Sequence, residues 1–240
     1  MTLLVEDRGA VRFLSMNRPD KRNALNTALT RALLDGLRAA DAADSVAAVV
    51  LTGAGQAFCA GADLSEFKDL TPEYQHRVEE RAELTMQLHL VFSKMAKPVV
   101  TAINGTAMGG GAGLAIAGDL AVMAQGAKLG YPETRHGIVA AIVMANLVRQ
   151  VGRKQAFELV ALGEPLSSER ALALGMVNRV VPDEDLLSET LKLAEKLSNI
   201  KPEALRATKQ LFHEVADLPL EEALKRGRDT NQRMRAFWKV

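Results

Sequence analysis

The sequence predicts an α/β fold in which a mostly parallel sheet occupies the first half of the chain and helices dominate the rest. Two continuous apolar runs, Val46 to Thr52 and Pro98 to Ile103, are typical of strands covered on both faces, as in a parallel sheet. Segments with apolar residues at helical spacing stand between these runs. The strand-rich part ends near residue 135, and helical segments follow it.

The first elements are a β-hairpin, a helix and a buried strand. Alternating apolar residues within 3–16, on either side of Asp7-Arg8-Gly9, predict two short strands joined by a tight turn. The segment from Thr27 to Ala43 is rich in Leu and Ala at helical spacing, which predicts a helix. The apolar run from Val46 to Thr52 is then a strand that Gly53 ends.

The same rhythm of strand and helix continues along the chain. A long helix with one apolar stripe is expected from Pro72 to about Met95, before the buried strand at Pro98 to Ile103. Gly109 to Ala117 is expected to be a helix whose first turn is glycine. Shorter strands are expected at Leu120 to Ala124 and at Lys128 to Tyr131.

Helices are expected through the remainder of the chain, at Ile142 to Val151, Lys154 to Leu162, Ser168 to Leu174, Asp183 to Leu197 and Pro202 to Val215. The stretch from Leu220 onward is amphipathic and basic. It either packs on a neighbouring subunit or remains a solvated helix, and the solvated interpretation is slightly favoured.

Composition excludes several classes of function. Of 240 residues, 48% are hydrophobic and 25% charged, and the net charge of +1 gives no general attraction to nucleic acid or anionic membranes. No apolar run approaches the ~20 residues that cross a bilayer, and the N-terminus has no signal-peptide core. The single cysteine, Cys59, fits a reducing compartment. We therefore expect a cytoplasmic protein that binds neither nucleic acid nor membranes.

Two glycine-rich turns are the main functional signal. The first is AFCAGADL, from Ala57 to Leu64, and the second is NGTAMGGGAGLAIAGDL, from Asn104 to Leu120. Small residues let a ligand approach the backbone, and the start of a helix offers free N–H groups. One N–H from each turn would form an oxyanion hole, in which a donor contributes roughly 3–4 kcal/mol to the transition state. Either turn alone is more often structural than catalytic.

A carboxylate near these turns completes a set suited to enolate chemistry. Glu133, in GYPET, can move a proton at the carbon next to the carbonyl that the two amides polarise. Burial would raise its pKa, which suits a group that gains and loses a proton. The alternative is a surface or salt-bridged glutamate. The following Arg135 and His136 are interpreted as supporting or surface groups rather than catalytic ones.

The ordered motifs AFCAGADL, KPVVTAINGTAMGGGAGLAIAGDL and LGYPE resemble the crotonase (enoyl-CoA hydratase/isomerase) superfamily. The similarity runs from NRPDKRNALN, at Asn17 to Asn26, to Val181. The resemblance implies a crotonase-like spiral of ββα units over residues 1–181, with the acyl-CoA site, and a C-terminal helical trimerisation region over 182–240. It also implies a homotrimer or a dimer of trimers. Coenzyme A would be part of the substrate, so no separate cofactor is expected.

The resemblance also implies roles for individual residues. The backbone N–H groups of Ala62 and Gly110 would form the oxyanion hole, and Glu133 would carry the proton. Five residues would lie along the CoA, namely Arg22, Ala24, Ala60, Asp63 and Leu64. No metal is expected, because His76, His89 and His213 stand alone without the spacing of metal ligands. Asp63 and Asp119 are interpreted as turn caps.

One departure from the family pattern affects the reaction. Hydratases of this family usually carry a second glutamate three residues after the second hole donor, and this chain has Gly113 there. A single carboxylate can take a proton from C2 and return it at C4, which favours double-bond isomerisation. Hydration that is weak or that uses another acid, another enolate reaction such as decarboxylation, and a non-catalytic CoA-binding scaffold remain alternatives.

Overall fold

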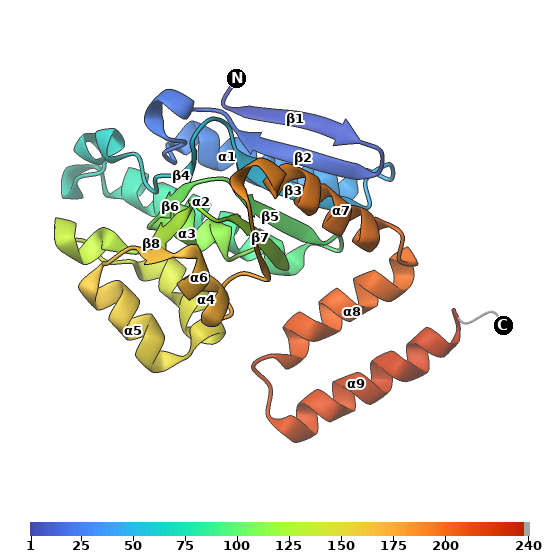
Figure 1. Cartoon of the computed structure of the whole chain (residues 1–240). Coiled ribbons are helices and arrows are strands. Elements are labelled where there is room, and N and C mark those ends of the chain that lie inside the picture. Colours follow the sequence, from blue (N-terminus) through green and yellow to red (C-terminus); the bar gives the residue numbers. More distant parts are fainter. Residues whose placement is uncertain (238–240) are drawn as a thin grey trace.

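Four strand–strand–helix units follow one another along the first part of the chain (Figure 1). The structure is a computed structural model that describes residues 1–237, with the backbone alone at positions 69 and 72. The units are β1-β2-α1, β3-β4-α2, β5-β6-α3 and β7-β8-α4, and helices dominate the chain after them. The expected α/β spiral of ββα units is therefore confirmed.

The strands are β1 Leu3–Arg8, β2 Val11–Met16, β3 Ala48–Gly53, β4 Ala57–Cys59, β5 Val99–Ile103, β6 Thr106–Met108, β7 Leu120–Ala124, β8 Lys128–Gly130, β9 Leu166–Ser167 and β10 Arg179–Val181. The α-helices are α1 Thr27–Ala42, α2 Gln75–Lys94, α3 Gly110–Ala115, α4 Ala141–Val151, α5 Arg153–Leu162, α6 Ser168–Ala173, α7 Leu186–Ser198, α8 Pro202–Val215 and α9 Leu220–Arg235. Short 3-10 helices are η1 Pro19–Lys21, η2 Leu64–Asp69, η3 Pro72–Tyr74, η4 Pro132–His136 and η5 Asp183–Asp185.

The strands form two sheets, and each unit after the first contributes to both. The larger sheet has the order β1-β2-β3-β5-β7-β10, and the smaller has the order β4-β6-β8-β9. The neighbours β4, β6 and β8 pair in parallel, with Cys59 opposite Ala107 and Met108 opposite Gly130. Because carboxyl ends of parallel strands meet at one edge of a sheet, the segments that follow these three strands lie side by side.

The central strands of the larger sheet are continuous apolar runs, and both are buried. All residues of β3 and β5 are buried, as expected for continuous apolar runs. Helix α1 turns Leu29, Leu33 and Leu37 toward the core, and α7 contacts the strands β2, β3, β5 and β7. The core is built mainly from aliphatic side chains, in agreement with the 4% aromatic content, and it also contains Phe13, Phe58 and Phe92.

Four strands lie where the sequence analysis expected no strand. These are β4, β6, β9 and β10, each of two or three residues. Such lengths are too short to display a period of two. The two glycine-rich segments therefore contain β4 and β6, and their small residues after Cys59 and after Met108 follow strands of the smaller sheet.

The C-terminal helices extend from the body as a hairpin of α8 and α9 (Figure 1). Helix α8 is anchored by Lys209, which is 6% exposed and donates to the carboxylate of Asp119 and to Lys97 O, both at 2.8 Å. Asp119 also accepts from Val99 N at 2.7 Å, so it links α8 to the sheet. No residue of α9 is buried within this chain. The division at residue 181 and the trimer stay predictions, and positions 238–240 lie outside the described residues.

Among residues 1–237, no helix combines the length and the apolar character that crossing a membrane requires.

The ion pair between Lys209 and Asp119 predicts a large stability effect. Lys209→Met should lower the free energy of unfolding by about 3–5 kcal/mol, because it leaves a mostly buried carboxylate without its cation. Lys192, an exposed residue of α7 that pairs with Glu189, provides the control. Urea unfolding of the two variants should show little change for Lys192→Met, and an equally small change for Lys209→Met would contradict this view of Asp119.

Candidate active site

Three segments meet beside the smaller sheet, each directly after one of its parallel strands. Ala60, Gly61 and Ala62 follow β4, Gly109 follows β6 and precedes α3, and Tyr131 to Glu133 follow β8. The Gly109 N–H donates to Gly130 O at 2.8 Å, which ties the second segment to the third. The two glycine-rich turns and the carboxylate, far apart in sequence, are thus neighbours in the structure.

The two turns approach each other at their glycines. Gly61 has φ +91°, and a Cβ built there would lie 2.7 Å from Met108 O and 3.5 Å from Gly110 N. A side chain at this position would therefore push the turns apart, and the left-handed backbone itself favours glycine.

Ala62 and Gly110 each present a backbone amide without a partner. Leu25 N donates to Gly61 O at 2.7 Å, and Asp63 N donates to Leu25 O at 3.1 Å. Because successive amides of an extended segment point in opposite directions, the Ala62 N–H points away from Leu25. Gly110 is the first residue of α3, where N–H groups have no partner within the helix. Within residues 1–237 neither amide donates a hydrogen bond.

Loop 22–25 is fixed against the first turn by Asn23. Its buried side chain donates to Ala54 O at 2.9 Å and Ala57 O at 2.8 Å, and it accepts from Arg18 N at 2.9 Å. Ala60 N donates to Arg22 O at 2.9 Å. These bonds hold the loop beside β4.

Four of the five residues expected along the CoA line this loop and turn, and they are Arg22, Ala24, Ala60 and Leu64. Arg22 and Leu64 are exposed, whereas Ala24 and Ala60 are partly buried. The fifth residue, Asp63, uses its carboxylate within the protein. It pairs with Arg18 at 2.8 Å and accepts from Ser65 N at 3.1 Å as the cap of η2. A ligand would therefore meet Asp63 chiefly through its backbone.

Glu133 lies against the start of α3. A Cβ at Gly109, where φ is +53°, would be 2.8 Å from Glu133 Oε1, so the glycine leaves room for the carboxylate. Oε2 is buried and has no hydrogen-bond partner within the described part of the chain. Burial raises the pKa of Glu133, although its own backbone N–H and the nearby His136 act in the opposite direction.

Tyr131 is the second polar group of this segment. Its ring is buried, and its hydroxyl has no partner among residues 1–237. Burial and the negative charge of Glu133 raise the pKa of Tyr131, so the phenol stays protonated. Arg135 and His136, by contrast, are exposed, and Arg135 donates to Leu162 O at 3.0 Å.

His89 of α2, which the sequence analysis treats as an isolated histidine, is buried beside Gly113. It is 8% exposed, and a Cβ at Gly113 would lie 2.8 Å from its Cε1. Burial lowers the pKa of His89 to about 4. The sequence held one signal that could have drawn attention to His89. It stands three residues before Phe92 on the buried stripe of the helix, where a polar residue is unusual.

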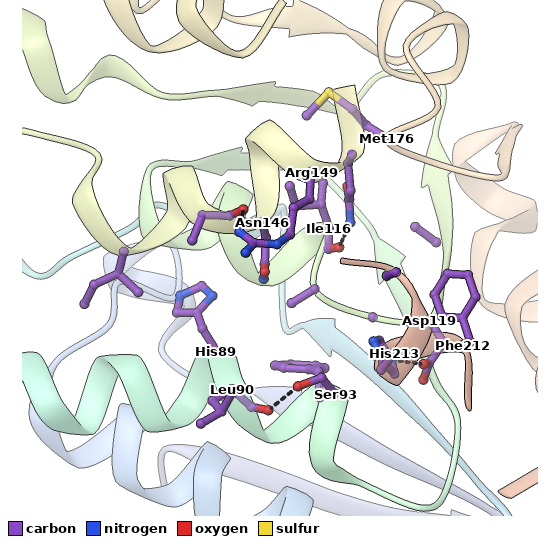
Figure 2. Close-up of a pocket in the computed structure, with 18 of the residues that line it drawn as sticks. His89, Leu90, Ser93, Ile116, Asp119, Asn146, Arg149, Met176, Phe212 and His213 are labelled. Carbon is purple, nitrogen blue, oxygen red and sulfur yellow. Dashed lines mark hydrogen bonds and ion pairs between the residues drawn. The ribbon is translucent and has the colours of Figure 1, made fainter. Parts of the chain in front are cut away.

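His89 also borders a cavity of about 570 Å³ between α2, α3, α4 and α8. Figure 2 shows its imidazole pointing from α2 into this space, which Ile116, Asn146 and Phe212 also line. Ala62, Gly110 and Glu133 do not line the cavity, whereas His89 lines it and also approaches Gly113 of α3. In the described part of the chain, no three His, Cys, Asp or Glu side chains gather in a way that could hold a metal ion.

Comparisons with known proteins agree with this fold. A family model described as enoyl-CoA hydratase/isomerase matches residues 6–236. A Thermus thermophilus protein whose name contains the words enoyl-CoA hydratase is 40% identical over 222 residues, covering 91% of this chain and 87% of its own length. The 2,3-dehydroadipyl-CoA hydratase of Escherichia coli is 35% identical, with 94% and 87% covered.

Solved structures are similar over nearly the whole chain. The enoyl-CoA hydratase of Bacillus anthracis superposes with a TM-score of 0.91 at 30% identity, covering 97% of this chain and 90% of that one. The enoyl-CoA hydratase of Mycobacterium smegmatis gives a TM-score of 0.92 at 32% identity, with 98% and 91% covered.

The raised pKa of Glu133 predicts that removing its charge stabilises the protein. The folded state favours the protonated acid. The stability that Glu133 contributes in this form is therefore complete below the unfolded pKa of about 4.3, and it is lost as pH rises through the folded pKa. Glu133→Gln should therefore raise the melting temperature at pH 8, and the difference from wild type should shrink toward pH 4. Thermal unfolding at both pH values measures this, and a destabilised variant at pH 8 would contradict it.

Proposed function

Since the chain belongs to the enoyl-CoA hydratase/isomerase family, we propose that it stabilises the enolate of an acyl-CoA thioester and moves a proton at C2. The supporting observation is the placement of Glu133 beside Gly109, next to the unpartnered amide of Gly110. A thioester α-proton is too weakly acidic for a carboxylate in water. Two preorganised amides lower the energy of the enolate, and this makes removal of the α-proton by Glu133 feasible.

In this proposal the thioester oxygen accepts hydrogen bonds from the N–H groups of Ala62 and Gly110. The CoA runs along Arg22, Ala24, Ala60, Asp63 and Leu64, whose segments border the same turns. The free Ala62 amide supports this placement, because the parallel bridge to Leu25 leaves it directed away from that residue.

We propose double-bond isomerisation as the main reaction. The carboxylate of Glu133 removes the C2 proton of a 3-enoyl-CoA, and the electron pair moves onto the thioester oxygen as a dienolate. Glu133 then gives the proton to C4, and the double bond stands between C2 and C3. One acid whose pKa is raised by burial can perform both transfers.

Hydration of a 2-enoyl-CoA is the second candidate. The names of the relatives support it, as does one observation in the structure, the unpartnered imidazole of His89 beside Gly113. A homotrimer or dimer of trimers and a cytoplasmic location stay predictions. The exposed Leu220 and Leu224 on α9 support an association of subunits.

The function is tested with Glu133→Gln. Wild type should isomerise a 3-enoyl-CoA, seen as rising absorbance of the conjugated thioester, and should exchange the C2 protons of butanoyl-CoA in D2O. The variant should lose both activities by ~10²–10⁴-fold, because the proton carrier is gone. Glu195→Gln on the exposed face of α7 is the control and should keep both. Full activity of Glu133→Gln, or none in wild type, would refute the assignment.

Gly109→Ala tests whether this glycine positions the acid. The added methyl would lie 2.8 Å from Oε1 of Glu133 at a backbone φ of +53°, so both the loop and the carboxylate must shift. A displacement of about 1 Å can cost ~10²-fold in rate, so kcat for isomerisation should fall by about this factor. Gly227→Ala on α9, where a Cβ meets nothing within 4 Å, should leave kcat unchanged.

A further inference from the structure

An imidazole fills the space that a side chain at Gly113 would need. A Cβ there would lie 2.8 Å from Cε1 of His89 and 2.3 Å from Cγ1 of Val143. The packing of α2 and α4 against α3 therefore requires glycine at this position. The absence of a side chain at Gly113 therefore leaves the space that the buried His89 ring occupies.

His89 and Glu133 lie against the same short segment of backbone. Glu133 Oε1 approaches Gly109, and the His89 ring approaches Gly113. Gly113 N donates to Gly109 O at 2.9 Å, so the two positions are one helical turn apart. One turn rises about 5.4 Å, a separation that allows one acyl group bound at Gly110 to reach both side chains.

The imidazole has no hydrogen-bond partner among the described residues. His89 is 8% exposed, and within residues 1–237 neither Nδ1 nor Nε2 makes a hydrogen bond. Buried polar atoms of this kind are normally satisfied, which indicates that water or a ligand completes the site. Because burial lowers the pKa of His89 to about 4, the ring is neutral at pH 7 and one nitrogen can accept a proton.

We propose that His89 is a catalytic residue that takes the proton of a water molecule adding to C3 of a 2-enoyl-CoA. The inference rests on the proposed function, because it uses the same amides and Glu133. It assigns the work of a second acid–base group to a side chain from α2, and it makes this chain a hydratase as well as an isomerase.

The step balances with the groups present. The water oxygen bonds to C3 and its proton passes to a His89 nitrogen, while the C2–C3 pair moves onto the thioester oxygen held by Ala62 and Gly110. Protonated Glu133 gives its proton to C2, the carbonyl re-forms and a 3-hydroxyacyl-CoA results. The carboxylate left on Glu133 favours the new imidazolium nearby. Transfer of the proton from His89 to Glu133 restores the starting state.

The cavity gives the reacting water a place beside the imidazole. The His89 ring lines this cavity, and Asn146 of α4 adds a polar side chain to its wall (Figure 2). Water held there would lie beside His89, which lines the cavity.

The test compares two reactions in one set of variants. His89→Gln should lower kcat/KM for hydration of a 2-enoyl-CoA by at least ~10²-fold. Isomerisation of a 3-enoyl-CoA and C2 exchange of butanoyl-CoA in D2O need only Glu133, and they should stay within about threefold of wild type. His76→Gln, an exposed histidine on the same helix, should change neither reaction. Added imidazole should restore part of the hydration lost in His89→Ala.

Three outcomes overturn the proposal. The first is hydration that survives in both His89 variants. The second is an equal fall of hydration, isomerisation and C2 exchange without rescue by imidazole, which would make His89 a packing residue. The third is a wild-type protein that isomerises but does not hydrate, which removes the role of His89 and leaves the proposed function standing. A wild type that neither isomerises nor exchanges C2 protons refutes the proposed function itself.

Discussion

The parallel register of three very short strands holds the parts of this site together. Strands β4, β6 and β8 are each three residues long, and their pairing brings the segments after them to one edge. The Gly109 N–H donates to Gly130 O, and this bond ties the second glycine-rich segment to the turn that carries Glu133. A slip of one residue would turn side chains to the opposite face and separate the amides from the acid.

Glycine provides the close approach that this register needs. Gly61 lies against the end of β6, Gly109 leaves room for the carboxylate, and Gly113 leaves room for an imidazole. Each gap faces a polar group that has no hydrogen-bond partner within residues 1–237, either an amide, Glu133 Oε2 or the His89 ring. Buried groups of this kind reduce stability by roughly 1–3 kcal/mol each, a cost that is typical of a site prepared for a ligand.

Much of the fold was predictable because its signals are local. Val99–Ile103 and Ala48–Gly53 are long apolar runs, and α1 shows a clear apolar stripe, so composition and spacing identified them. The strands β4 and β6 escaped detection because three residues carry no period. The assignments of Glu133, Ala62 and Gly110 came from turn chemistry and the resemblance together, whereas His89 was set aside because no partner stands near it in sequence.

The order of the long strands and helices, the glycine-rich turns and the lone acid can be read from the sequence, since each depends on residues close together in the chain. What lies opposite each glycine depends on the folded structure. The contact of His89 with Gly113 joins α2 to α3, and the tie of Lys209 to Asp119 joins α8 to the sheet. Such contacts depend on how helices pack in three dimensions. The spacing of residues along one chain predicts single helices and strands, but not which side chains of different elements meet.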